Sequence, residues 1–218
     1  MNSDRVVLNY LQLAHNDYLT ARHLLFNGYL EHGALLASTS AEKYLKAIIG
    51  IHNINNRDHL GRTVYKLVEK CQPVLYKSFD HDFLKFLEKA YKLRYAHTSS
   101  PGFSMVINQY RTLYGIDNLV SQIDSGFHLK SNNEIFKTPF QQAILANDER
   151  VIKDNVAINP ALFIKFLDRH NKVLELKIEN DFQTVHIQYE TEKVNMIGEF
   201  SKIPEISMNK SKFTLTKG

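Results

Sequence analysis

Three charged side chains lie close together in a stretch that is otherwise typical of a buried helix. Glu42, Lys43 and Lys46 all occur in the run AEKYLKA, residues 41–47. Because Glu42 and Lys46 are four residues apart, one interpretation is a surface ion pair that stabilises the helix by about 0.3–0.5 kcal/mol. The other is a binding site, since a lysine at a groove of a helix bundle can meet a phosphate as a point charge. Lys43 offers the same chemistry, and the sequence leaves both interpretations open.

A second group of reactive residues follows a later apolar stretch. Arg94, Tyr95 and His97 precede the turn signal SSPG at residues 99–102. Cations near the C-terminus of a helix interact favourably with its exposed carbonyl groups, so one interpretation is a helix end. The other is a ligand site, with Arg94 on a phosphate, Tyr95 stacked on a base or ribose, and His97 as a hydrogen-bonding or acid–base group.

Other kinds of site are not predicted. The chain has one cysteine, and four metal ligands cannot be assembled from its local sequence, so we expect no metal and no other cofactor. It contains no GxxxxGK[ST] phosphate loop, no GxGxxG turn and no motif of a serine or cysteine nucleophile. Asp58 stands just before His59 at the start of a predicted helix, and we expect Asp58 to cap that helix.

Composition indicates a globular protein. The 218 residues are 44% apolar and 23% charged, which fits one domain with an appendage or two small domains. The net charge of +4 is compatible with phosphate-bearing partners but too small to indicate nucleic-acid binding. With a single cysteine, no signal-peptide pattern and no apolar run of about 18 residues, we expect a cytoplasmic protein without a membrane partner.

Helices must position the candidate residues. Apolar residues at steps of three and four predict one helix over residues 7–25 and a second over 30–48, joined at Asn27-Gly28. Alanines on the second stripe allow another backbone to come close, which favours an antiparallel hairpin. The same spacing predicts three further helices, over residues 60–71, 79–93 and 106–123.

The pattern changes after Gly126. Residues 130–137 are polar and indicate a linker, and residues 140–146 and 161–167 predict short helices. Alternation of apolar and polar residues over 173–178 and 184–189 predicts a β-hairpin. We therefore predict a mainly α fold. An antiparallel bundle of four or five helices is expected over residues 1–128, and a C-terminal α+β extension that contains the β-hairpin over residues 129–218.

Residues 3–125 resemble the HEPN family, the higher eukaryote and prokaryote nucleotide-binding domains. Four pieces carry the resemblance: HNDYLTARHLL at 15–25, AEKYLKA at 41–47, His59-Leu60, and Leu93-Arg94-Tyr95 followed by Pro101. The AEKYLKA run is the most specific of them. The resemblance implies an antiparallel bundle of four or five helices that is often dimeric.

The family has two functional styles. One is a metal-independent ribonuclease with an Arg and a His separated by four to six residues. The other lacks that motif, binds nucleotides and often pairs with a minimal nucleotidyltransferase, in some cases as toxin and antitoxin. Only Tyr95 and Ala96 separate Arg94 from His97 here, which favours the second style. The resemblance then implies a binder of a nucleotide or other phosphate-bearing ligand, with these ligand residues: Lys43, Lys46, Arg94, Tyr95 and His97.

Two alternatives stay open. The first is a metal-independent ribonuclease that acts on RNA with Arg94 and His97 as its catalytic residues. The second is a ligand-free interaction module that forms a homodimer through an exposed apolar helix face. The sequence does not decide whether the protein is an enzyme, and it gives no role for residues 129–218.

Overall fold

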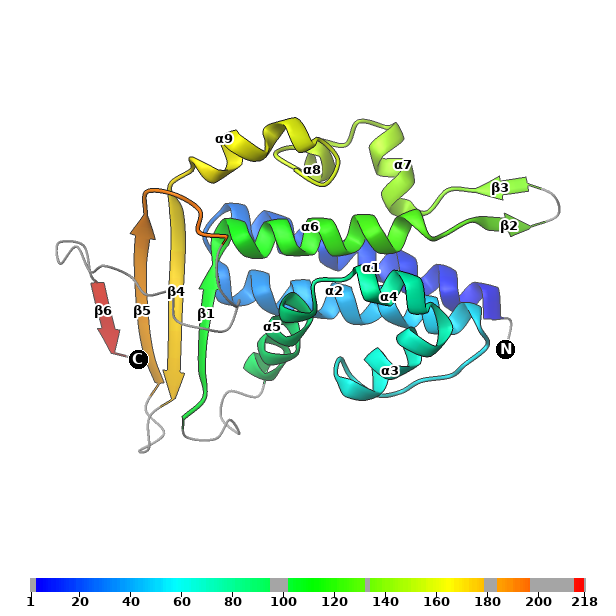
Figure 1. Cartoon of the computed structure of the whole chain (residues 1–218), viewed down its shortest axis with the longest axis horizontal. Coiled ribbons are helices and arrows are strands. Elements are labelled where there is room, and N and C mark those ends of the chain that lie inside the picture. The colour runs from blue at the N-terminus through cyan, green and yellow to red at the C-terminus, as the bar shows by residue number, and fades with distance from the viewer. Residues whose placement is uncertain (1–2, 95–101, 132–133, 179–183, 197–213, 218) are drawn as a thin grey trace.

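The computed structural model of the chain is mainly helical, with a small antiparallel sheet at one end (Figure 1). It describes residues 3–94, 102–131, 134–178, 184–196 and 214–217. In Figure 1 the long helices α1, α2 and α6 run side by side along the molecule. The sheet lies at the end where α1 turns into α2.

Helices α1 (Ser3–Phe26) and α2 (Leu30–Ile51) form the antiparallel hairpin that the sequence predicts. A Schellman motif ends α1: the Tyr29 amide donates to the Leu24 carbonyl at 2.9 Å and the Gly28 amide to the Leu25 carbonyl at 3.0 Å. Gly28 has φ +80°, which glycine adopts without strain. Both predicted stripes are buried: Val7, Leu11, Ala14, Tyr18, Ala21 and Leu25 on α1, and Leu30, Ala34, Ala37, Ala41, Tyr44 and Ile48 on α2.

Three shorter helices and one long helix complete the helical part: α3 (Arg62–Cys71), α4 (Pro73–Ser78), α5 (His81–Tyr91) and α6 (Gln109–Ser125). α5 begins at Asp80, whose carboxylate accepts hydrogen bonds from the amides of Asp82 and Phe83, each at 3.0 Å. A 3₁₀ turn over residues 92–94 extends α5. The predicted helices over 60–71 and 79–93 are thus present with shifted starts.

A helix was predicted over residues 106–123, but its predicted start is wrong. Residues 104–108 form the strand β1 (Ser104–Asn108), and α6 begins after it with Asn108 as its cap. The Asn108 side chain accepts a hydrogen bond from the Arg111 amide at 3.0 Å. β1 is a strand because it pairs antiparallel with β4 (Asn171–Ile178), with Val106 opposite Glu175. Local periodicity cannot reveal a partner so distant in the sequence.

The β-hairpin predicted near the C-terminal end is confirmed. β4 pairs antiparallel with β5 (Thr184–Thr191), with Glu175 opposite Ile187. β6 (Thr214–Lys217) pairs with β5, so the order of the sheet is β1-β4-β5-β6. Leu174 and Leu176 on β4 join the core of the helices, whereas Val173, which points to the opposite face of the strand, belongs to a separate apolar cluster.

Shorter elements lie between α6 and β4. They are β2 (Leu129–Ser131), β3 (Glu134–Phe136), α7 (Pro139–Leu145), α8 (Glu149–Ile152), the 3₁₀ turn η2 (Pro160–Leu162) and α9 (Phe163–Leu167). The prediction of a linker over residues 130–137 is wrong, because β2 and β3 pair there as a two-stranded antiparallel ribbon. The short helices expected over 140–146 and 161–167 are confirmed. Thr138 caps α7 and forms a capping box with Gln141.

A buried ion pair lies at the centre of the helical part. Arg22 on α1 and Asp117 on α6 form a salt bridge, and their side chains are 1% and 2% exposed. Asp117 also accepts a hydrogen bond from the Tyr18 hydroxyl at 2.7 Å. Burial raises the pKa of the Asp117 carboxyl, and the charge and hydrogen bond of Arg22 oppose that shift.

The same arginine also binds the backbone of α8 and of the residue that follows it. Its Nε donates to the backbone carbonyl of Arg150 at 2.8 Å, and its Nη2 donates to that of Lys153 at 2.5 Å. Asn155 donates to the Tyr18 hydroxyl at 3.1 Å. Three side chains from α7 and α8 join the apolar core of α1 and α2: Phe140, Ala143 and Val151. These residues therefore pack against the bundle through both polar and apolar contacts.

We predict that Asp117→Asn lowers the free energy of unfolding by about 3 kcal/mol, because it leaves a buried guanidinium without its counter-charge. The control is Asp82→Asn, which removes the exposed ion pair with Lys85 and should cost about 0.5 kcal/mol or less. Urea unfolding of both variants measures the difference. Equal losses in the two variants would contradict a central role for the buried pair.

His15 gives the structure a predictable response to pH. It is 5% exposed and lies against the rings of Tyr18 and Phe140. Burial lowers its pKa from 6.5 to about 4; Asp148 opposes the shift and Arg150 adds to it. The unfolded chain therefore takes up a proton at this residue at a higher pH than the folded chain does.

We predict that neutral, buried His15 contributes to the free energy of unfolding. This contribution is fully present above pH 6.5 and is lost as the pH falls from 6.5 to about 4. The loss should reach about 3 kcal/mol at most. Urea unfolding over this pH range measures it, with His15→Leu as the comparison. The variant should show a flatter dependence on pH, and the same slope in both proteins would contradict the assignment.

Candidate phosphate-binding site

Lys43 lies between the first two helices. Its Nζ is 2.6 Å from Oδ2 of Asp17 on α1, and the two side chains are 24% and 21% exposed. Lys43 therefore links α1 to α2. The structure does not bring it to the other residues that the sequence singles out.

Lys46 forms the ion pair with Glu42 that the spacing predicts, with Nζ 2.8 Å from Oε1. The side chains are only 10% and 11% exposed, so the pair is more deeply placed than a surface pair. The same oxygen of Glu42 lies 3.6 Å from Nδ1 of His59. A largely buried carboxylate is thus shared between a lysine and a histidine.

The other carboxylate oxygen of Glu42 holds the chain that leads into α3. It accepts a hydrogen bond from the Leu60 amide at 3.0 Å. The expectation that Asp58 caps this helix is wrong, because α3 begins only at Arg62 and Asp58 instead accepts a hydrogen bond from Asn56 at 3.1 Å. Glu42, from another helix, fixes this segment in its place.

Arg94 reaches the same face of α2 from the end of α5. Its Nη2 donates to the Thr39 hydroxyl at 2.9 Å. Its guanidinium carbon lies 4.9 Å from the centre of the Tyr91 ring, a cation–π distance. The Tyr91 ring lies in turn 5.1 Å from the His59 ring. The side chain of Arg94 is therefore held in place although the residue is exposed.

These contacts gather six side chains on one face of α2, which we call the α2 cluster: Thr39, Glu42, Lys46, His59, Tyr91 and Arg94. Two are cations and one is a carboxylate. The His59 side chain is 64% exposed and Arg94 is exposed, so both face solvent. A guanidinium and an ammonium are both groups that can bind a phosphate. Tyr95 and His97 lie outside the described residues.

Sequence reasoning missed Thr39 and Tyr91 as members of this cluster. Thr39 precedes Glu42 by three residues, which places both on one side of a helix. Tyr91 precedes Arg94 by three residues in the same way. Helical spacing relative to the charged residues is the signal that would have found them.

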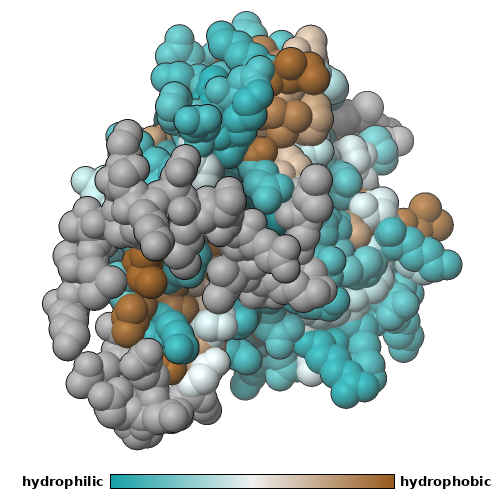
Figure 2. Space-filling model, turned by 60° about the vertical axis from the view of Figure 1, so that its left-hand side comes forward, coloured by the Kyte–Doolittle hydropathy of each residue, from teal (hydrophilic) through white to brown (hydrophobic). Residues whose placement is uncertain are grey.

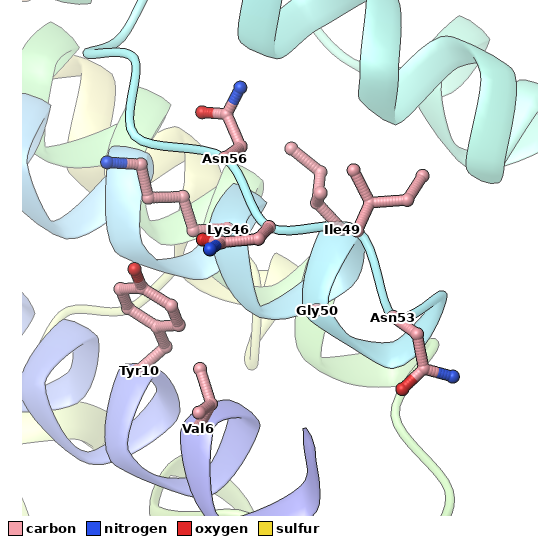
Figure 3. A pocket seen from close by; sticks show the side chains of 9 residues that line it. Val6, Tyr10, Lys46, Ile49, Gly50, Asn53 and Asn56 are labelled. Carbon is pink, nitrogen blue, oxygen red and sulfur yellow. The ribbon is translucent and has the colours of Figure 1, made fainter. Parts of the chain in front are cut away.

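A cavity of about 220 Å³ opens beside the α2 cluster (Figure 3). Its lining consists of Val6, Tyr10, Lys46, Ile49, Gly50, Asn53, Ile54, Asn55 and Asn56. In Figure 3 the Tyr10 hydroxyl points toward the side chain of Lys46. Lys46 belongs to both the cavity and the cluster, so the two adjoin.

A wider cavity of about 600 Å³ lies between α1 and α8. Two cations on its wall already have partners: Arg22 pairs with Asp117, and Arg150 pairs with Asp148 at 2.6 Å. None of the ligand residues predicted from the sequence lines this cavity. The α2 cluster is therefore the stronger candidate.

Within the part of the chain that the structure describes, no group of three or more His, Cys, Asp or Glu residues is placed to hold a metal ion. No helix of that part combines the length and the apolar character needed to cross a lipid bilayer. Comparison of the chain with protein-family models, with curated proteins and with solved structures gave no match. The function has to be argued from the geometry of the site.

We predict that Glu42→Ala lowers the free energy of unfolding by about 2–4 kcal/mol, because it removes the acceptor of the Leu60 amide and leaves Lys46 unpaired. The control is Asp17→Ala, which breaks the more exposed pair with Lys43 and should cost about 1 kcal/mol or less. Urea unfolding gives both values. Hydrogen exchange of the Leu60 amide should speed up only in Glu42→Ala, and unchanged exchange would contradict the role of this carboxylate.

Proposed function

We propose that residues 3–125 form a HEPN-like bundle that binds a nucleotide or another phosphate-bearing ligand at the α2 cluster. The observation that carries the proposal is the meeting of three distant segments. The AEKYLKA run, His59-Leu60 and Arg94 contact one another through the Glu42 carboxylate and the Tyr91 ring. They belong to three of the four pieces that resemble the family.

Arg94 is the main phosphate ligand in this proposal. A guanidinium carries five N–H donors in a planar fork, and the bond to Thr39 uses one of them. Because Thr39 and Tyr91 hold the side chain, binding loses less conformational entropy than it would with a free arginine. Lys46 and Arg94 together carry one more charge than Glu42 compensates, which favours an anion. The exposed ring of His59 offers a further hydrogen bond or a stacking surface.

The proposal does not include the partners that the resemblance implies or the ribonuclease activity of other family members. These remain predictions from the resemblance. They include the homodimer, the nucleotidyltransferase partner and the toxin–antitoxin role. The ribonuclease alternative depends on His97, which lies outside the described residues, so no contact of the described residues favours it.

The interaction-module alternative needs a large exposed apolar face. In the view of Figure 2, brown is confined to small patches among the coloured residues. The large exposed apolar residues of the described part are spread over many elements: Leu8, Leu13, Tyr29, Ile51, Val74, Phe136, Leu145 and Ile164. Apolar side chains scattered in this way are normal for a protein surface. They do not favour that alternative.

We predict that Arg94→Gln weakens the binding of adenosine monophosphate by about 10- to 100-fold, because a charge-assisted hydrogen bond to phosphate contributes about 1.5–3 kcal/mol. The matched control is Lys92→Gln. It removes a positive charge from the same turn, and Lys92 is exposed, so the affinity should change less than about twofold. Titration calorimetry on the full chain measures both.

The unaltered protein provides the decisive comparison. Binding to the folded state must raise its thermal unfolding midpoint. If nucleoside mono-, di- and triphosphates at millimolar concentration all leave the midpoint unchanged, the proposal fails. It also fails if Arg94→Gln and Lys92→Gln weaken binding equally, because that result would indicate general charge attraction only.

A further inference from the structure

Two planar side chains at the surface of the α2 cluster, His59 and Arg94, lie against the ring of Tyr91. The ring centres of His59 and Tyr91 are 5.1 Å apart, and the two ring planes are tilted by 30°. The guanidinium carbon of Arg94 lies 4.9 Å from the centre of the Tyr91 ring. Tyr91 is only 8% exposed, whereas the side chain of His59 is 64% exposed. Tyr91 is therefore the buried support of two exposed planar groups.

The contacts of His59 show which part of its ring is open. Tyr91 lies against one face of the ring, and Oε1 of Glu42 lies 3.6 Å from Nδ1 at its edge. Among the residues that the structure describes, no other side chain makes a hydrogen bond, ion pair or ring contact with His59. The large exposed fraction of this side chain therefore lies on the second face of the ring and at its Nε2 edge.

The ring of His59 is also attached to a fixed stretch of backbone. The amide of Leu60, the next residue, donates to Oε2 of the largely buried Glu42 carboxylate at 3.0 Å. Because the neighbouring peptide and one face of the ring are held, stacking on the open face costs little additional conformational entropy. Proteins stack nucleobases on exposed aromatic side chains, and histidine is one of the residue types that they use.

The position of Arg94 indicates where the rest of the ligand lies. Arg94 and His59 contact the same tyrosine ring, so a single small ligand can reach both. A guanidinium binds a phosphate through charge-assisted hydrogen bonds, whereas the face of an aromatic ring accepts another flat ring. A nucleotide carries both groups, joined through one ribose. A sugar phosphate has no flat ring for the second surface.

We propose that the open face of His59 is the base subsite of the phosphate-binding site, and that the ligand is a nucleotide whose base stacks there while its phosphate meets Arg94. This inference rests on the proposed function. It narrows the ligand from phosphate-bearing molecules in general to nucleotides. Purine nucleotides bind more tightly than pyrimidine nucleotides in this arrangement, because a larger ring system stacks more strongly.

The test compares adenosine monophosphate with ribose 5-phosphate by titration calorimetry on the full chain. Both ligands carry a phosphate on a ribose, so the difference in affinity reports the contribution of the base. Adenosine monophosphate should bind about 10-fold more tightly, which corresponds to about 1.4 kcal/mol and is typical of one base stacked on an aromatic side chain.

Two variants of His59 separate stacking from hydrogen bonding. His59→Phe keeps an aromatic face but has no ring nitrogen, and His59→Leu has neither. The advantage of adenosine monophosphate should stay at about 10-fold in His59→Phe and fall below about twofold in His59→Leu. Both variants should bind ribose 5-phosphate with equal affinity, because neither can donate a hydrogen bond to its phosphate. Since the side chain of His59 is mostly exposed, both variants should fold.

The control variant is His81→Leu. His81 is also exposed and also lies against a tyrosine, with its ring centre 4.9 Å from that of Tyr76. It is at the start of α5, whereas Arg94 follows the end of this helix. The preference for adenosine monophosphate should therefore persist in His81→Leu.

Equal affinities for adenosine monophosphate and ribose 5-phosphate in the unaltered protein would overturn the base subsite and leave the phosphate site standing. A preference that survives in His59→Leu, or one that is lost in His59→Phe as well, would overturn it too. If neither ligand nor any other nucleotide binds, the proposed function fails together with this inference.

Discussion

Arg22 is buried in the middle of the helices, and its charge has to be compensated there. An isolated guanidinium in such a position would cost several kcal/mol. Asp117 supplies the counter-charge, and the rings of Tyr18 and Phe26 lie 5.7 and 5.3 Å from the guanidinium carbon. Its remaining donors reach two backbone carbonyls, that of Arg150 in α8 and that of Lys153 just after it. Because one side chain needs partners from α1, from α6 and from α8 with the residue after it, these parts depend on one another.

In the candidate site, Glu42 is likewise a largely buried charge that needs partners from more than one segment. Its largely buried carboxylate needs donors, and it finds them in Lys46 on its own helix and in the Leu60 amide of a distant segment. The helix that carries Glu42 packs closely on α1, where a Cβ at Gly33 would lie only 2.7 Å from Cγ of Leu25. A site built on closely packed helices keeps its geometry better than one built on loops alone. The proposed binding of an anion by Arg94 and His59 relies on this rigidity.

The sequence predicted the elements whose pattern is local. The apolar stripes of α1 and α2, the turn at Gly28 and the β4–β5 hairpin all follow from side-chain spacing over one segment. β1 could not be predicted in this way, because Val106 is in a strand only through its pairing with β4. The ion pair of Glu42 and Lys46 was likewise visible in the spacing, but its burial and its link to Leu60 were not. Those depend on which segments fold against α2.

The central claim is that the α2 cluster binds a phosphate-bearing ligand, and a heteronuclear NMR titration with adenosine monophosphate tests it most directly. The account predicts saturable chemical-shift changes at Thr39, His59, Leu60 and Arg94, with little change around the 600 Å³ cavity between α1 and α8. Changes confined to that second cavity, or no saturable change at the four residues of the first set, would contradict it.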